Sequence, residues 1–454
     1  MKIALINPPA RVRMIRDYYC SKTSKSTYLF APADLLMQSG LLGKDNELTA
    51  IDAIAEGLDS KRCLERLKSF KPNLALGLIG AVGLQEDTAF YEALKGLAPD
   101  CKIFLSGEPV LEDGEDFLKQ NPFVEGILLR FISPGIAQFI KGQSEPEALL
   151  FRQNGEIKSF PAATSSEYSV GRARQELFQN PRYFFSFAKR RRFATFLTDF
   201  GCPYQCGFCV MASLGYRRRD LSEVEEELDY LSWLGVKELF LEDQSFGAVP
   251  SHGKKVMELF KKFGNSYTAF VRPDQGDLEF WKSLKDSGCH TVILGLESAV
   301  PEILSAYSKG YDREKIAQGV RQAKEAGLKV VATVIIGLPE DTRESIAQTM
   351  KFLRELEPDF ASYNLAVPRS LTALRKTALS EGLAINTEMD QAGSFPALRT
   401  RTLSGKQLIA LKQKAVRDFY LRPGYILKRM AGAKSAFDLY AFAREGLSVT
   451  GKNI

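Results

Sequence analysis

Histidine is almost absent from this sequence: only His252 and His290 occur in 454 residues. No histidine precedes residue 252, which excludes imidazole ligation of a metal or cofactor by the earlier part of the chain. Long apolar runs are absent too, and none approaches the roughly 18 residues that a membrane-spanning helix needs. The start of the chain lacks the apolar stretch of a secretion signal, so we expect a cytoplasmic protein without a transmembrane segment.

A disulfide framework is also missing. The seven cysteines include one cluster of three, which does not match a small secreted protein and favours a reducing compartment. Hydrophobic residues make up 45% and charged residues 26%, which is the composition of ordinary globular domains. The net charge of +6 gives only weak support to an anionic partner. The length predicts two or three domains.

Strands and helices alternate through residues 1–142. Apolar runs predict strands over residues 2–6, 48–51, 73–79, 102–105 and 126–129, and amphipathic stretches predict helices over 33–42, 60–70 and 85–97. This alternation predicts an α/β fold with a parallel, doubly wound, Rossmann-like sheet. Such sheets bind ligands beyond the carboxyl ends of their strands. The candidate binding residues at these ends are Asn7, Pro8, Pro9, Gly80, Ser106 and Gly107.

Three further regions follow. Residues 143–190 have no steady period and are interpreted as a linker. Residues 191–370 contain six predicted strands, over residues 193–197, 238–241, 267–271, 291–296, 330–336 and 360–365, separated by helical stretches. Six such units predict a partial (β/α)6 barrel of the TIM type, with its active face at the carboxyl ends of the strands. Residues 371–454 are predicted to be mainly helical, with a helical stretch over 408–419.

A cysteine motif follows the first barrel strand. Cys202, Cys206 and Cys209 have the spacing CxxxCxxC, and three thiolates on one short loop can hold three irons of a [4Fe–4S] cluster. The fourth iron is then open to a ligand that is not protein. A zinc site is the alternative, but zinc requires a fourth Cys or His, and the nearest histidine is His252.

With Phe208 before its last cysteine, this loop resembles that of the radical S-adenosylmethionine (SAM) enzymes. The resemblance spans residues 190–370 and includes Arg272-Pro273-Asp274, Gly295-Leu296-Glu297-Ser298 and Gly337-Leu338-Pro339 at successive strand ends. It implies contacts with SAM from a set of residues near the strand ends. The members of this set are Phe208, Glu242, Asp243, Arg272, Asp274, Glu297, Ser298 and Gly337.

The resemblance implies reductive cleavage of SAM at the cluster and hydrogen abstraction from an unactivated carbon. It also implies a reducing partner such as flavodoxin or ferredoxin, and a small-molecule substrate. The aromatic content of 11% would suit a hydrophobic substrate.

The N-terminal region resembles that of the cobalamin-binding radical SAM enzymes. The motifs are Ile6-Asn7-Pro8-Pro9 and Ile51-Asp52-Ala53, together with residues 419–425 of the tail. The family often has Gly-Gly where this chain has Ser106-Gly107, which puts the ligand in doubt and leaves a domain without cobalamin as the alternative. If cobalamin binds, no histidine of this region can ligate cobalt, so we expect a base-off state without a histidine ligand.

The leading interpretation is therefore cobalamin-dependent methyl transfer to an unactivated carbon. The same architecture also serves cobalamin-dependent cyclases and rearrangement enzymes. A tRNA methylthiotransferase would need three further cysteines, but Cys63 and Cys101 fall where buried apolar cysteines are common, and we do not expect nucleic acid as a partner. A non-catalytic iron–sulfur protein is the remaining alternative. Two basic runs, at residues 189–192 and 217–219, are interpreted as solvated rims, with binding of phosphate, nucleic acid or an anionic lipid surface as the alternative.

Overall fold

The computed structural model describes residues 1–454 except 25–27, 387–388, 394, 433–439, 441 and 445–454. The described chain forms two compact units. Unit 1 comprises Met1–Thr23, Leu29–Tyr183 and Arg217–Leu234, and unit 2 comprises Ser24–Tyr28, Phe184–Tyr216 and Gly235–Ile454. Within the described residues, no helix is both long and apolar enough to cross a membrane.

Unit 1 is built on a seven-stranded sheet with the order β4-β1-β5-β6-β7-β8-β9. The first five strands in this order are parallel, and β8 and β9 join antiparallel. The strands are β1 (Lys2–Asn7), β4 (Glu47–Asp52), β5 (Leu74–Leu78), β6 (Lys102–Ser106), β7 (Gly126–Leu128), β8 (Leu149–Gln153) and β9 (Glu156–Phe160).

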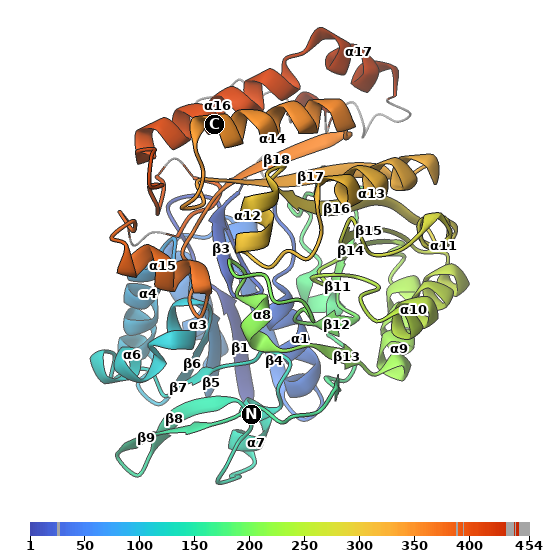
Figure 1. Ribbon diagram of the computed structural model, residues 1–454. Coiled ribbons are helices and arrows are strands. Elements are labelled where there is room, and N and C mark those ends of the chain that lie inside the picture. The colour runs from blue at the N-terminus through green and yellow to red at the C-terminus, as the bar shows by residue number, and fades with distance from the viewer. Residues whose placement is uncertain (25–27, 387–388, 394, 433–439, 441, 445–454) are drawn as a thin grey trace. The chain divides into compact units, whose positions relative to one another are not determined.

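Helices cover both faces of this sheet (Figure 1). On one face the ring of Phe104 in β6 lies 4.9 Å from that of Phe139, in α7 (Gly135–Ile140), and α7 contacts α1 (Ala33–Gly43). Ile103 and Leu105 point to the other face because side chains alternate along a strand, and they share a core with α3 (Ser60–Phe70) and α4 (Leu84–Leu97). The doubly wound α/β fold is confirmed. Shorter helices are α2 (Ala53–Glu56), α5 (Pro109–Glu112) and α6 (Gly114–Gln120).

Most of the region interpreted as a linker, residues 143–183, groups with unit 1 and has secondary structure. Strands β8 and β9 form a hairpin whose turn, Asn154-Gly155, has positive φ angles of 53° and 83°. An Asn-Gly pair favours such a turn between two strands. Further along lie β10 (Glu167–Tyr168) and the 3-10 helix η2 (Gln175–Phe178).

One segment expected in the barrel also groups with unit 1. It contains β13 (Arg217–Arg219) and α9 (Leu221–Trp233). The Glu223 carboxylate accepts hydrogen bonds from the backbone N–H groups of Val170 and Gly171, each at 2.9 Å. Arg219 is fully buried and donates a hydrogen bond to Glu227 at 2.6 Å. The basic run at residues 217–219 is therefore not a solvated rim.

Unit 2 contains a six-stranded parallel sheet with the order β11-β14-β15-β16-β17-β18, which confirms the six expected strands. They are β11 (Ala194–Phe196), β14 (Glu238–Leu241), β15 (Ser266–Val271), β16 (Cys289–Glu297), β17 (Lys329–Ile336) and β18 (Phe360–Leu365). The main helices are α10 (Pro250–Phe263), α11 (Leu278–Asp286), α13 (Arg313–Glu325), α14 (Arg343–Leu356) and α16 (Gly405–Tyr420). Shorter elements are β12 (Asp199–Phe200), α8 (Met211–Leu214), α12 (Pro301–Ala306), α15 (Ala373–Ser380) and α17 (Pro423–Ala431).

Side-chain caps begin several of these helices. Asp277, Asp312 and Thr342 each accept a hydrogen bond from a backbone N–H in the first turn of α11, α13 and α14 respectively. These caps fix where each helix leaves the loop that follows a strand. The loops at the carboxyl ends of the strands therefore have defined starting and ending points.

Candidate active site

The cysteine loop follows β12 in unit 2 and is held by backbone hydrogen bonds. The N–H of Gly207 donates to the Tyr307 carbonyl at 3.0 Å, and the Gly207 carbonyl accepts from the N–H of Leu374 at 2.9 Å. Gly201 has a φ of 74°, and a β-carbon there would collide with the carbonyl oxygen of Gly215. Only glycine fits at this entry to the loop.

The thiols of Cys202 and Cys209 are largely removed from water. Burial raises the pKa of Cys202 to about 11 and that of Cys209 to about 12, so both remain protonated at neutral pH until a metal or another positive charge stabilises the thiolate. Among the described residues, no group of three or more His, Cys, Asp or Glu side chains is arranged to hold a single metal ion. Three sulfur donors on one loop fit a [4Fe–4S] cluster, whose irons are spread over a larger volume.

A buried lysine lies beside the cysteine loop. Lys309 is 7% exposed, and its Nζ lies 3.1 Å from Oε1 of Glu297. The same Nζ lies 5.4 Å from the ring centroid of Phe208, which stands between Cys206 and Cys209. The structure therefore places a positive charge next to the position where thiolates would carry negative charge.

Glu297 reaches Lys309 from an irregular strand end. The register of β16 against β17 shifts between Gly295 and Glu297, and Glu297 has a φ of 61°. A β-carbon at Gly295 would lie 2.5 Å from Oε1 of Glu297, so glycine leaves room for this carboxylate. Non-glycine residues with positive φ are concentrated at functional sites, where the surrounding structure holds them. Glu297 is therefore a predicted site residue whose unusual backbone conformation is held by the surrounding structure.

Arg272 and Asp274 form a clamp on the cysteine loop. The guanidinium donates to both carboxylate oxygens of Asp274 at 2.9 Å and to the Lys309 carbonyl at 2.8 Å. It also lies 3.7 Å from the ring centroid of Tyr204, between Cys202 and Cys206. Stacking and bidentate pairing use the planar fork of arginine. These contacts support positioning of the loop, while the sequence resemblance had suggested contact with SAM.

Asp243 also stabilises the backbone near the cysteine loop. Its fully buried carboxylate accepts hydrogen bonds from the N–H groups of Thr198 at 2.7 Å and Asp199 at 3.0 Å. It therefore fixes the corner that leads into the cysteine loop. Its neighbour Glu242 follows β14 directly and is 5% exposed.

The last two expected SAM residues shape turns. Ser298 Oγ accepts from the N–H of Val300 at 3.2 Å, just before α12. Gly337 has a φ of 97°, and its N–H donates to Oδ2 of Asp341 at 2.9 Å. The sequence analysis did not select Asp341, which follows the Gly-Leu-Pro-Glu run directly. It also assigned no function to Lys309, which lies in the run Ser308-Lys309-Gly310.

Replacing Lys309 by methionine should lower the reduction potential of the bound cluster. A positive charge stabilises the more negative, reduced form, so its removal makes the one-electron reduction about tenfold less favourable, or about 59 mV. A redox titration followed by electron paramagnetic resonance measures this change. Lys309→Arg keeps the charge and should retain most of the potential, and equal shifts in both variants would contradict the electrostatic explanation.

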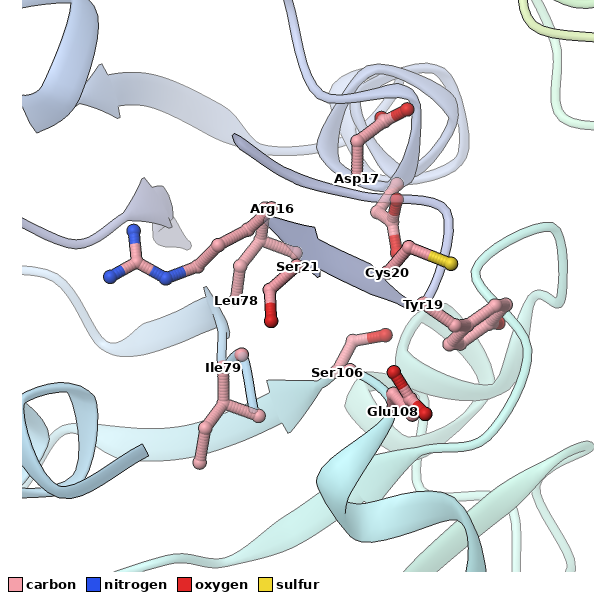
Figure 2. Close-up of a pocket in the computed structure, with 12 residues that line it drawn as sticks. Arg16, Asp17, Tyr19, Cys20, Ser21, Leu78, Ile79, Ser106 and Glu108 are labelled. Carbon is pink, nitrogen blue, oxygen red and sulfur yellow. The ribbon is translucent and has the colours of Figure 1, made fainter. Parts of the chain in front are cut away.

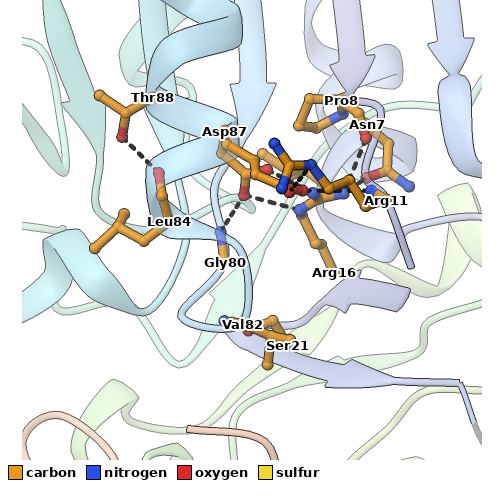
Figure 3. A network of polar contacts seen from close by, with 12 residues as sticks. Asn7, Pro8, Arg11, Arg16, Ser21, Gly80, Val82, Leu84, Asp87 and Thr88 are labelled. Carbon is orange, nitrogen blue, oxygen red and sulfur yellow. Dashed lines mark hydrogen bonds and ion pairs between the residues drawn. The ribbon is translucent and has the colours of Figure 1, made fainter. Parts of the chain in front are cut away.

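In unit 1, a hairpin covers part of the expected cobalamin edge. It consists of β2 (Met14–Asp17) and β3 (Cys20–Thr23), which pair antiparallel. Nη1 of Arg16 donates to Asn7 Oδ1 and to the Pro8 carbonyl, each at 3.0 Å (Figure 3). Nε of Arg16 donates to Asp87 at 2.9 Å, and Asp87 also accepts from the N–H of Gly80 at 2.9 Å. The hairpin therefore contacts Asn7 and Pro8 directly, and Asp87 links it to Gly80.

Two other expected residues, Ser106 and Gly107, line a small pocket beneath the hairpin (Figure 2). Its volume is about 10 Å³, which is room for one water molecule. Ser106 is 1% exposed, and its Oγ has no hydrogen-bond partner among the described residues. Its hydroxyl and the Glu108 carboxylate point into the same space (Figure 2). The pocket fits one small polar group of a ligand, and cobalamin as a whole does not fit inside it.

The carboxyl group of Asp17, at the end of β2, is close enough to that of Asp34, in α1, for the two to interact. Asp34 accepts from the N–H of Tyr18 at 2.5 Å, and Asp17 accepts from the N–H of Ala33 at 2.5 Å. Burial, and then the nearby Asp17, raise the pKa of Asp34 to about 8. Asp34 is therefore mainly protonated at neutral pH and can also donate a hydrogen bond.

Cys63 and Cys101 are placed as core residues and not as ligands of a second metal site. Cys63 lies in α3 and Cys101 precedes β6, and both belong to the apolar core of unit 1. Burial raises the pKa of Cys63 to about 12 and that of Cys101 to about 11. Such thiols are inert core residues, which removes the structural basis for a methylthiotransferase with a second cluster.

Part of the chain matches a known protein family. Residues 199–353 match the radical SAM superfamily. Over 451 residues the chain is 26% identical to a protein named uncharacterized methyltransferase from Pyrococcus horikoshii, with 94% of each chain covered. It is 24% identical over 277 residues to tryptophan 2-C-methyltransferase from Streptomyces laurentii, which covers 57% of this chain and 44% of that one.

A solved structure has the same fold. The radical S-adenosylmethionine methyltransferase TsrM from Kitasatospora setae, determined with cobalamin and a [4Fe–4S] cluster, superposes with a TM-score of 0.70 and covers 98% of both chains. At 16% identity this likeness shows the fold. It confirms an α/β architecture that combines a Rossmann-like domain with a partial barrel.

Proposed function

We propose that this chain, whose residues 199–353 match the radical SAM superfamily, is a cobalamin-dependent C-methyltransferase that acts on an unactivated carbon of a small molecule. The observation that carries the proposal is the three-cysteine loop in unit 2, held by backbone hydrogen bonds beside the buried Lys309–Glu297 pair. A methyltransferase is favoured over other radical SAM reactions because both curated relatives described above carry that name.

The residues around the cysteine loop have different functions in this proposal. A bound [4Fe–4S] cluster and SAM supply reductive cleavage of SAM and hydrogen abstraction. Cys202, Cys206 and Cys209 would hold the cluster, and Glu297 would bind hydroxyl groups of SAM while it remains paired with Lys309. The side chains of Lys309 and Glu297 are only 9% and 12% exposed, which would limit the access of water to this part of the site.

Unit 1 would bind cobalamin without a histidine ligand. The chain's two histidines both lie in unit 2, where His252 Nε2 is 2.9 Å from the Thr198 carbonyl and His290 Nε2 is 2.8 Å from Glu238. When bound, cobalamin supplies a carrier for a methyl group. Ser106 Oγ fits as a hydrogen-bond partner for one of its polar groups because this buried hydroxyl has none in the described protein.

Anaerobic reconstitution with iron, sulfide and hydroxocobalamin tests the proposal. We expect about four irons per chain, from the three-cysteine loop, and stoichiometric cobalamin with a base-off optical spectrum. Iron without cobalamin would leave a radical SAM enzyme of another class. A spectrum with histidine nitrogen bound to cobalt would contradict the proposed binding mode.

A variant of Ser106 locates cobalamin on unit 1. Ser106→Ala should weaken cobalamin binding by roughly fivefold, because a neutral hydrogen bond contributes about 1 kcal/mol. Iron content should not change, since Ser106 lies in the other unit from the cysteines. Ser133→Ala is a matched control, because that buried hydroxyl is also in unit 1 and bonds to the Glu147 carbonyl. Equal weakening in both variants would point to a general loss of structure.

A further inference from the structure

One exposed basic run remains without a function. Lys189, Arg190, Arg191 and Arg192 are all exposed and immediately precede β11. No acidic residue occurs between residues 184 and 194. The run lies at the amino end of a barrel strand, the end of a barrel that carries stability and not catalysis.

Helix α17 presents a second basic segment together with apolar side chains. Leu427 is 66% exposed and Met430 is 57% exposed. Lys428 is exposed and Arg429 half-buried between them, and residues 421–432 contain no acidic side chain. A short helix with apolar and basic side chains and no acidic ones has the chemistry of a helix that lies in a lipid headgroup layer.

Contacts around the first residue of β18 bring the two segments to one end of unit 2. The ring centroid of Phe187, two residues before Lys189, lies 4.7 Å from that of Phe360. The Arg429 guanidinium lies 4.3 Å from the centroid of the same Phe360 ring. The Tyr425 hydroxyl donates to the carbonyl of Asp359 at 2.9 Å, which anchors α17 there. The two segments therefore form one surface, which we name the basic end: residues 189–192 and 421–430.

We propose that the basic end docks on an anionic lipid surface. Seven basic side chains lie in the two segments, at residues 189–192, 422, 428 and 429, and clusters of four to eight such residues are typical of binding to acidic headgroups. Nucleic acid would use the charge but not the exposed Leu427 and Met430, whereas a headgroup layer accommodates both. Docking at the amino ends of the strands does not involve their carboxyl ends, where the cysteine loop lies.

Flotation of the full-length protein with lipid vesicles tests this proposal. We expect binding to vesicles of equal parts phosphatidylglycerol and phosphatidylcholine, little binding to phosphatidylcholine alone, and weaker binding as salt increases. The triple variant Arg190→Gln, Arg191→Gln, Arg192→Gln should bind anionic vesicles at least about tenfold less, since each basic residue near the surface contributes to the attraction. The variant Leu427→Ser, Met430→Ser should lose the binding that persists at high salt.

A matched control removes three charges elsewhere in unit 2. Lys254, Lys255 and Lys261 are exposed on α10, and changing all three to glutamine should leave vesicle binding within about twofold of the parent protein. Circular dichroism confirms that each variant folds. Absence of binding to anionic vesicles would overturn the proposal, as would equal loss in the control variant. Tight binding of an RNA duplex, abolished by the same arginine changes and unaffected by the Leu427 and Met430 changes, would also overturn it.

Discussion

Replacing Cys202, Cys206 or Cys209 by alanine is expected to abolish both iron binding and the cleavage of SAM. Each sulfur holds one iron, and a cube with only two protein ligands is not retained. The effect should be complete for each cysteine, because each variant leaves only two of the three protein ligands. Iron content and formation of 5′-deoxyadenosine under reducing conditions measure the two losses.

Two cysteines outside the loop provide matched controls. Cys101 lies in the core of unit 1, and Cys289 lies in β16 with 1% exposure. Cys101→Ala and Cys289→Ala should reduce stability slightly through lost packing, with iron and SAM cleavage retained. Retained SAM cleavage in any variant of the three loop cysteines would refute the cluster assignment.

Replacing Asp87 by alanine should cost unit 1 about 3–5 kcal/mol of unfolding free energy. Arg16 is 2% exposed and Asp87 is fully buried, so the change leaves a guanidinium in the interior without its counter-charge. It also removes the acceptor of the Gly80 N–H. Urea unfolding followed by probes in unit 1 measures the change.

A neighbouring exposed ion pair provides the control for this change. Glu86, one residue earlier in α4, lies 3.0 Å from Arg11, whose side chain is 89% exposed. Glu86→Ala should cost no more than about 1 kcal/mol, because solvent screens an exposed pair. The double variant Arg16→Met, Asp87→Leu should be more stable than Asp87→Ala alone, since no unpaired charge remains. Equal losses for Glu86→Ala and Asp87→Ala would show that burial is not the cause.

The strands of both sheets could be predicted from sequence because their apolar runs are short, buried and bounded by turns. The run at residues 102–105 corresponds to β6, which extends one residue further. The cysteine loop could be found because its three ligands lie within eight residues of one another. In both cases the information is local.

The β2–β3 hairpin could not be predicted because its stability depends on distant partners. Charged residues such as Arg16 and Asp17 are usually found at the surface. Arg16 is instead buried in an ion pair with Asp87, which lies 71 residues away in the sequence. Lys309 was also difficult to interpret, because only the bulge at Glu297 turns that carboxylate toward it. The β8–β9 hairpin was missed for a different reason: its Asn-Gly turn is a local signal that the sequence analysis did not use.

The hydrogen bonds around the cysteine loop bear on how the enzyme is assembled in the cell. Zinc fingers fold only when metal is present, because the metal supplies most of their folding free energy. Here the Gly207 backbone is already bonded on both sides, to Tyr307 and Leu374, and the charge of Lys309 is already balanced by Glu297. Protein–protein contacts therefore help to hold this loop in place, so its conformation does not depend on metal ligation alone. A variant that loses the cluster would then lose less folding free energy than a zinc finger that loses its metal.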